Sequence, residues 1–339
     1  MARVEELELL DVRDTSVERL LQKAREIRDS CTDYTVTKAN HECMRFNDDA
    51  ELSYITSVGE VRHSPMSRYA LSQLCTKIGV PTNYIDKCVD SGRIELAQDN
   101  VNSWLMSFNK DLLIREYNDS IRGILSTKYS ICDTDEILET VDGVLNLDHF
   151  NIKGYYLTPE RFHLRMTLKE RMNIEGEDLF AGLSFDSSDV GKSILRVRFL
   201  VFKQVCTNGL IVSKSSNQLF HQKHIGISSE EFAEGLEESI KIFPDLIEGV
   251  EDMIINASSE STYKFRGITQ EQFDDLVVRI TRETPVSAEE ARKVISIMQE
   301  GRYEDSKWGY INALTDVAKE LTLEKRLEVE EYAGSLLVA

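Results

Sequence analysis

Strand-forming segments follow one another through the middle of the chain, and this order rules out several fold classes. Five segments rich in β-branched and aromatic residues lie between 150 and 214, separated by turn sequences such as Asp-Ser-Ser-Asp and Thr-Asn-Gly. No helical segment connects them, so βαβ units are excluded and an antiparallel sheet is predicted. Two more strands, predicted within 112–131 around a turn at Asn118-Asp119-Ser120, are expected to join the same sheet.

Helical patterns occupy both ends of the chain. Apolar residues at positions 17, 20, 21, 24 and 27 have helical spacing, which predicts an amphipathic helix within residues 1–35. Capping boxes at Ser228–Glu231, Thr269–Gln272 and Ser287–Glu290 predict further helices. The predicted fold class is therefore α+β, a central largely antiparallel sheet with N-terminal helices and a mainly helical C-terminal third. The predicted regions are an N-terminal lead-in helix and connecting segment (1–62), an α+β core (63–226) and a helical C-terminal region (227–339).

Two shorter helical signals lie within the predicted core. Residues 74–85 have the spacing of a helix-turn-helix around Gly79. The second helix of this pair carries one lysine and no arginine, so a structural scaffold is favoured over a DNA-reading unit. Farther along, Asp133 and Glu136 form a capping-box pattern that predicts the start of another helix.

The composition excludes several classes of protein. The 339 residues include 40 Lys and Arg against 59 Asp and Glu, and the net charge of −19 opposes whole-molecule attraction to nucleic acid or an anionic membrane. No apolar run approaches the roughly 18 residues of a membrane helix, and the acidic N-terminus does not resemble a signal peptide. We therefore expect a cytoplasmic protein that does not contact a membrane. Six dispersed cysteines predict reduced, unliganded thiols.

One segment departs from the acidic average. Between Val190 and His224 there are six basic residues and no acidic one, so this basic window carries +6 against −25 for the remainder. The acidic sequence that follows allows two interpretations, an exposed anion-binding face or an acidic helix that covers the basic strands and neutralises them. The candidate nucleic-acid-binding residues of the window are Lys192, Arg196, Arg198, Lys203, Lys214 and Lys223.

The predicted hairpin at 112–131 combines cations with aromatic side chains. A platform for single-stranded nucleic acid requires this mixture for phosphate neutralisation and base stacking, but purely structural sheets also contain it. The candidate platform residues are Trp104, Arg115, Tyr117, Arg122, Lys128 and Tyr129.

Searches for catalytic, nucleotide-binding and metal-binding motifs give no match. Gly191-Lys192-Ser193 resembles the end of a phosphate-binding loop, but Asp186 replaces the first glycine and a strand follows, so a hairpin turn is predicted. The short His and Cys pairs near residues 41 and 221 lack the second half of a zinc site. The sequence therefore predicts no cofactor and no metal, and it provides no argument for an enzyme.

An apolar stripe near the C-terminus is wider than a terminal helix with one solvated side requires. It predicts a surface for self-association into a homo-oligomer or for domain docking. The residues of the stripe are Trp308, Ile311, Leu314, Val317 and Leu321.

Several stretches resemble one protein family. They read LSQLCTKIGVPTNYI, LLIREYNDSIRGILSTKYSICDTDEIL, SSDVGKSILRVRFLVFKQVCTNGLIVSK and, near the end, KWGYINALTDVAKEL followed by RLEVEEYAGSLL. They resemble the phage/plasmid-like proteins that carry domain of unknown function 932. The family pattern commonly has an arginine in place of Lys203 and an aspartate-histidine pair in place of Ala318-Lys319, so this chain resembles a divergent member. The resemblance implies carriage on phages, prophages and conjugative plasmids, and it implies no established reaction.

These observations lead to two functional hypotheses. The first is a non-enzymatic mobile-element protein that binds nucleic acid, above all single strands, during replication or recombination in the cytoplasm of a bacterial host. The basic window, the hairpin and the resemblance motivate it, and the net charge of −19 opposes it. The alternative is an acidic interaction protein that antagonises a host protein or defence system, in one version by mimicking DNA with its carboxylates.

Overall fold

The computed structural model describes residues 16–47, 50–174, 176–203, 209–212, 218–222 and 229–337. The helices are α1 (Val17–Asp29), α2 (Arg68–Ile78), α3 (Thr82–Asp90), α4 (Ile94–Leu105), α5 (Thr134–Leu145), α6 (Ser229–Ile240), α7 (Phe243–Ser259), α8 (Gln270–Glu283), α9 (Ala288–Gln299), α10 (Lys307–Ala318) and α11 (Leu323–Leu337), with a 3-10 helix at Leu147–His149. The strands are β1 (Cys31–Ala39), β2 (Met44–Phe46), β3 (Glu51–Ile55), β4 (Val61–Pro65), β5 (Lys110–Tyr117), β6 (Ser120–Ser126), β7 (Phe150–Leu157), β8 (Phe162–Leu168), β9 (Met172–Ile174), β10 (Glu177–Ser187), β11 (Leu195–Lys203), β12 (Gly209–Val212) and β13 (Gln218–Gln222).

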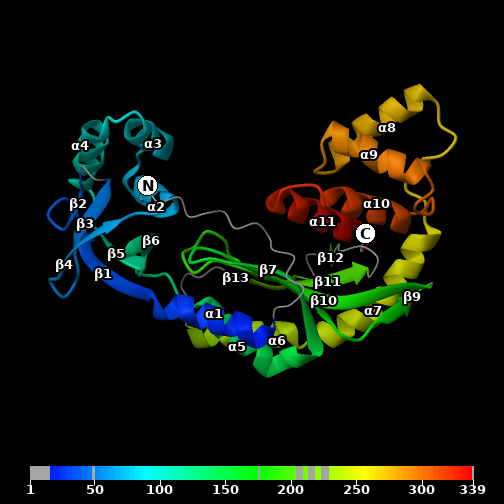
Figure 1. Ribbon diagram of the computed structural model, residues 1–339, viewed down its shortest axis with the longest axis horizontal. Helices are drawn as coiled ribbons and strands as arrows, with labels where there is room; N and C mark the ends of the chain where they lie inside the picture. Colours follow the sequence, from blue (N-terminus) through cyan, green and yellow to red (C-terminus); the bar gives the residue numbers. More distant parts are fainter. Residues whose placement is uncertain are drawn as a thin grey trace.

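The described strands form three antiparallel sheets. Two are small, with the orders β1-β5-β6 and β2-β3-β4, and the large one has the order β12-β11-β10-β8-β7, with β13 paired to β11 and β9 to β10. In Figure 1 the small sheets and α2 to α4 lie at one end of the molecule, and the large sheet and the C-terminal helices lie at the other. Antiparallel sheets followed by a helical C-terminal third confirm the predicted α+β class.

The prediction that residues 112–131 and 150–214 form one sheet is wrong. β5 and β6 pair with β1 instead, and α5 separates β6 from β7 along the chain. A helix and no strand was predicted within residues 1–35, but α1 ends at Asp29 and the β-branched and aromatic residues that follow form β1. This unpredicted strand supplies the hydrogen-bonding partner that the large sheet was expected to supply.

Several local predictions are confirmed. Gly79 ends α2 with a φ of +77°, and α3 follows at once, which is the predicted helix-turn-helix. α8 and α9 begin at the predicted capping boxes Thr269–Gln272 and Ser287–Glu290, each with both reciprocal hydrogen bonds. The third predicted box begins at Ser228, which lies outside the described residues. α5 also begins where it was predicted, but the Asp133 side chain makes no capping hydrogen bond.

The large sheet has one apolar and one polar face because residue types alternate along its strands. On β8, Phe162, Leu164 and Met166 point to one face and the residues between them to the other. The apolar face packs against α7, where the Phe199 ring centroid lies 5.8 Å from that of Phe243. In Figure 1, α10 and α11 lie on the opposite side of the sheet from α1, α5 and α6.

The apolar stripe of α10 lies inside the chain. Trp308 and Leu314 are 8% and 0% exposed, and α10 packs against α7, α9 and α11. The stripe therefore packs helices of one chain together, while self-association stays a prediction.

The structure bears on two predictions from composition, the absence of a membrane helix and the state of the cysteines. None of the described helices combines the length and the apolarity that crossing a bilayer requires. Five cysteines are described, and all five are free thiols. Cys206 lies outside the described residues.

Gly182 on β10 permits the close approach of β8, because a Cβ atom there would lie 2.1 Å from the carbonyl oxygen of Met166. Gly182→Ala should therefore lower the free energy of unfolding by about 2–3 kcal/mol, measured by urea denaturation. Gly143→Ala is the control on the exposed side of α5, where no atom lies within 4 Å of an added Cβ, and it should raise that free energy by about 0.5–1 kcal/mol. Equal effects of the two substitutions would contradict the tight contact between β8 and β10.

Candidate functional site

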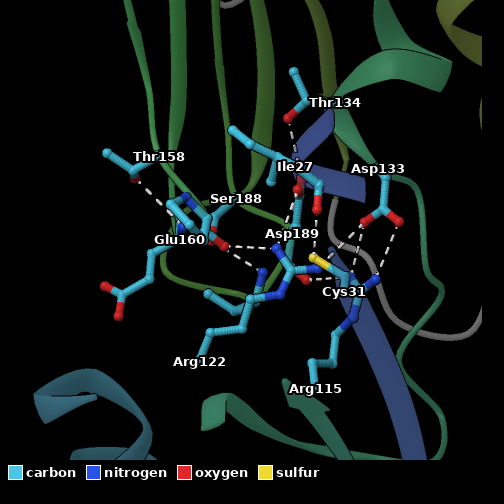
Figure 2. Close-up of polar contacts among 12 residues, drawn as sticks. Ile27, Cys31, Arg115, Arg122, Asp133, Thr134, Thr158, Glu160, Ser188 and Asp189 are labelled. Carbon is cyan, nitrogen blue, oxygen red and sulfur yellow. Dashed lines mark hydrogen bonds and ion pairs between the residues drawn. The ribbon is translucent and has the colours of Figure 1, made fainter. Parts of the chain in front are cut away.

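Arg115 and Arg122, the two arginines of the predicted platform, lie inside the molecule. They are 1% and 3% exposed on β5 and β6. Figure 2 shows both guanidinium groups directed into a cluster of polar side chains and main-chain groups. The expectation that these two residues form an exposed cationic face is therefore wrong, because carboxylates and carbonyls of the same chain surround them.

Arg115 is held by two carboxylates and one carbonyl. Its Nε donates to Asp33 on β1 at 2.8 Å, and its Nη1 lies 2.9 Å from an Asp133 oxygen. Nη1 also donates to the main-chain carbonyl of Asp189 at 2.7 Å, in the loop that joins β10 to β11. A buried guanidinium requires such partners because desolvation of an unpaired charge costs several kcal/mol.

Arg122 makes a second connection between the small sheet and the large one. Its Nη1 donates to the carbonyl of Pro159 at 2.6 Å, in the loop between β7 and β8, and lies 3.5 Å from the Asp189 carboxylate. Its Nε and Nη2 have no hydrogen-bond partner among the described residues. Both arginines therefore connect the small β1-β5-β6 sheet to loops of the large sheet.

The same contacts explain why Asp133 does not cap α5. An aspartate at this position ordinarily accepts a backbone N–H of the first helical turn, which is worth about 1 kcal/mol. Here the carboxylate faces Arg115, and loss of a partner from a buried ion pair costs more than loss of a cap. The adjacent Thr134 donates its hydroxyl to Asp189 at 3.2 Å. The junction network, as we call this cluster, consists of Asp33, Arg115, Arg122, Asp133, Thr134 and Asp189.

Hydrogen bonds fix the loop between β10 and β11 to its neighbours. Ser188 donates its hydroxyl to the carbonyl of Glu160 at 2.6 Å and accepts the main-chain N–H of Lys192 at 2.9 Å. Tyr129, which follows β6, donates to the Ser188 carbonyl at 2.9 Å. These bonds form the hairpin turn that was predicted for residues 186–193.

Burial changes the acidity of two groups near the junction network. It raises the pKa of Asp189 to about 6; the charge of Asp133 acts in the same direction, and Arg122 and Arg115 oppose it. Burial also raises the pKa of the Cys31 thiol to about 11. A thiol with this pKa stays protonated near neutral pH, so Cys31 is not an activated nucleophile.

The other platform residues have different surroundings. Lys128 is exposed, Trp104 at the end of α4 is 52% exposed, and Tyr117 is half-buried at the end of β5. Tyr129 is half-buried and bonded to the loop between β10 and β11. The structure therefore separates the exposed members of the predicted platform from its buried arginines.

The cations of the basic window are divided between a loop and the large sheet. Lys192 lies 3.3 Å from a Glu160 oxygen. On β11, Arg196 is half-buried and Arg198 is 3% exposed, with its Nη2 3.7 Å from Glu331 of α11. The acidic residues paired with these cations are therefore Glu160 and, on the last helix, Glu331, while α6 of the acidic segment that follows packs against β13 within the window. The side chains of Lys203, Lys214 and Lys223 lie outside the described residues.

The acidic segment after the window forms α6 and α7 and faces solvent. Residues 229–259 contain nine carboxylates and one lysine, and eight of the nine carboxylates are exposed. The single lysine, Lys241, lies 2.8 Å from Glu237, the ninth carboxylate. We call the eight exposed residues the acidic strip; they are Glu230, Glu231, Glu234, Glu238, Asp245, Glu248, Glu251 and Asp252.

An open cavity of about 780 Å³ is lined by residues of α7, α10 and β9. Its carboxylate Asp316 accepts a hydrogen bond from Tyr303 at 2.6 Å and pairs with Lys319 at 2.7 Å. The indole Nε1 of Trp308 donates to Glu177 at 3.0 Å. Because these polar groups bind one another, they specify no ligand. In the described part of the chain, no group of three or more His, Cys, Asp or Glu residues is arranged to hold a metal ion.

Comparison of the sequence with protein families places the chain in a known group. Residues 122–325, more than half of the chain, match the model of a family described as "Domain of unknown function (DUF932)". The chain belongs to the DUF932 family. No curated protein and no solved structure matches it.

The DUF932 match includes most of the junction network. It begins at Arg122 and contains Asp133, Thr134 and Asp189, whereas Asp33 and Arg115 precede it. The small sheet therefore contributes two charged partners from outside the matched segment.

Arg115→Met should destabilise the protein strongly, because it leaves buried carboxylates without their main counter-charge. We expect a loss of about 3–5 kcal/mol in the free energy of unfolding, measured by urea denaturation. Arg68→Met is the matched control, since Arg68 lies 2.8 Å from Asp86 but its side chain is 72% exposed. This surface pair should contribute about 1 kcal/mol or less. Similar losses in both variants would show that Arg115 is not the central partner.

Asp189→Asn should change how stability depends on pH. A raised pKa means that the folded state holds the proton more tightly than the unfolded chain, whose aspartate pKa is about 3.9. The resulting stabilisation is complete below pH about 4 and is lost as the pH rises to about 6. The stability of the wild type relative to Asp189→Asn should therefore fall by up to about 1.4 kcal/mol per pH unit across this window. Urea denaturation at several pH values measures it, and a constant difference would contradict the shift.

Proposed function

We propose that this protein is a non-enzymatic interaction protein whose acidic strip binds a positively charged surface on a macromolecular partner. The observation that carries the proposal is the opposite placement of the two kinds of charge. Eight carboxylates of α6 and α7 are exposed, whereas Arg115, Arg122 and Arg198 are buried. Long-range attraction follows the summed charge, so a chain of −19 favours a cationic partner.

One row of the acidic strip lowers the stability of α6, although Glu230 and Glu231 in the first turn of α6 and Asp245 in that of α7 are favoured by the helix dipole. Glu230, Glu234 and Glu238 follow one another at i, i+4 spacing, and like charges at this spacing repel by about 0.2–0.5 kcal/mol per pair. Glu238 also lies in the last turn of α6, where the helix dipole disfavours an anion. An arrangement that costs local stability supports a role in binding rather than in folding.

The resemblance to phage and plasmid proteins suggests the kind of partner. A mobile-element protein acts on host components, and the host proteins that present basic surfaces include those that bind DNA. On such a surface the carboxylates of the acidic strip would take the place of DNA phosphates, with electrostatic complementarity setting the association rate.

Neutralising part of the strip should weaken this interaction. The probe is a basic, sequence-independent DNA-binding protein that holds a fluorescent DNA duplex, and the wild-type chain should release the duplex at low salt, followed by fluorescence anisotropy. The variant carries Glu230→Gln, Glu234→Gln, Glu238→Gln and Asp245→Asn. We expect it to require about tenfold more protein for half-release, because each exposed charge contributes a fraction of a kcal/mol.

A second variant has the same net charge as the first, but its four substitutions lie outside the acidic strip. It carries Glu271→Gln, Asp274→Asn, Asp275→Asn and Glu289→Gln on α8 and α9, where these side chains are exposed. It should release the duplex nearly as well as the wild type. Equal weakening in both variants would attribute the effect to net charge alone, and failure of the wild type to release any duplex would reject the proposal.

Binding of single-stranded nucleic acid is the second candidate, and the exposed Lys128 and half-buried Arg196 favour it. Retention of a labelled oligothymidylate near 50 mM salt, with a log-log salt slope of about −0.7 per phosphate neutralised, would support it. Arg196→Ala should then flatten the slope. Arg198 is not suited to this test because its burial beside Glu331 ties it to stability.

A further inference from the structure

A layer of polar residues lies on the face of the large sheet that bears Arg165 and Arg198. β8, β10 and β11 are neighbours, and residues directly opposite one another share a face. Ser184 on β10 is the centre, with Arg165 opposite it on β8 and Arg198 opposite it on β11. We call this layer the polar grid; it consists of His163, Arg165 and Thr167 on β8, Ser184 and Asp186 on β10, and Arg196 and Arg198 on β11.

The polar grid is buried, apart from the half-buried Arg196, but it is incompletely hydrogen-bonded. Arg165, Ser184 and Arg198 are 4%, 0% and 3% exposed. An unpaired buried polar group costs about 1–3 kcal/mol, so a concentration of them requires an explanation. The grid atoms without a hydrogen-bond partner among the described residues are both ring nitrogens of His163, Nε of Arg165, Oγ1 of Thr167, Oγ of Ser184, and Nε and Nη1 of Arg198.

These unpaired groups share one chemistry. Guanidinium N–H groups can only donate hydrogen bonds, and hydroxyl groups and a neutral imidazole can each donate one. Burial, together with nearby arginines, lowers the pKa of His163 well below its usual range, so its ring is neutral near pH 7. A ligand that matches the grid must therefore accept several hydrogen bonds at once.

The charges around the grid also favour an anion. Five guanidinium groups face three carboxylates, an excess of two positive charges within a chain of −19. The arginines are Arg161, Arg165, Arg196, Arg198 and Arg326, and the carboxylates are Asp186, Glu330 and Glu331. A ligand with two negative charges would balance the cluster.

One carboxylate of α11 already binds at the edge of the grid. Glu330 is 0% exposed and forms a two-point ion pair with Arg165, in which Nη1 donates to Oε1 at 3.1 Å. Nε of Arg326 donates to the same oxygen at 2.8 Å. This is the geometry by which a guanidinium recognises a carboxylate or a phosphate. It leaves Nε of Arg165 and two nitrogens of Arg198 unused.

We propose that the polar grid is an oxyanion site that binds a phosphate group, and that Glu330 holds one edge of this site. A phosphate group presents several strong acceptor oxygens and a charge of about −1.5 to −2 near neutral pH, which matches the unpaired donors and the excess positive charge. The phosphate is either free or part of a larger phosphate monoester. This site is separate from the acidic strip, so it stands or falls independently of the proposed function.

The test is isothermal titration calorimetry of the full chain with sodium phosphate and with 5′-AMP, each against sodium chloride at equal ionic strength. We expect saturable binding of one phosphate group per chain. Ser184→Ala should weaken it by about tenfold, because it removes a donor to a charged acceptor. Arg171→Met should leave it unchanged, since Arg171 pairs with Asp178 and its side chain is 66% exposed.

Glu330→Gln gives the opposite expectation. Removing the competing negative charge should tighten phosphate binding by about tenfold, provided that the circular dichroism spectrum shows a folded chain. Equal binding of both probes indicates free phosphate, and tighter binding of 5′-AMP indicates a monoester. Two results would overturn the proposal: no saturable heat with either probe for both the wild type and Glu330→Gln, or equal binding by the wild type and Ser184→Ala. If Glu330→Gln does not fold, the comparison of the wild type with Ser184→Ala and Arg171→Met decides alone.

Discussion

The arrangement of the β1-β5-β6 sheet relative to the large sheet depends on one contact, the buried guanidinium of Arg115. It touches β1 through Asp33, the start of α5 through Asp133, and the loop between β10 and β11 through the Asp189 carbonyl. A desolvated charge must keep all of its partners, so the positions of these three elements depend on one another. Arg122 adds a parallel link through Pro159. The two sheets are therefore joined by paired charge as well as by apolar contact.

Charge of the two signs serves different purposes in this chain. Arginines of the 112–131 hairpin lie inside the junction network, and arginines of β8 and of the basic window lie inside the polar grid, where low dielectric strengthens their pairing. Acidic residues supply the partners of these cations and also cover α6 and α7. The surface therefore carries most of the net charge of −19. This is the reason for proposing an interaction protein with a cationic partner ahead of a nucleic-acid-binding protein.

Local features were predictable because their causes lie within a few residues. Gly79 ends a helix through its own positive φ, and the boxes at Thr269 and Ser287 cap helices through bonds to residues three positions away. Sheet membership was not predictable in this way. β1 pairs with a strand about eighty residues later, and nothing near residue 31 indicates that partner. Asp133 shows both effects, since its helix start was predicted and its side-chain partner was not.

The candidate site follows the same division. Alternation along β8, with Phe162 and Leu164 on one face and His163 and Arg165 on the other, determines from the sequence alone that the sheet has two unlike faces. A polar face is ordinarily expected to meet solvent, and the sequence contains no local sign that this one does not. Only the tertiary structure decided that α11 brings Glu330 onto it, 165 residues away from Arg165. The reason is physical: strand periodicity depends on neighbouring residues, whereas burial of a charge depends on which distant element supplies the opposite charge.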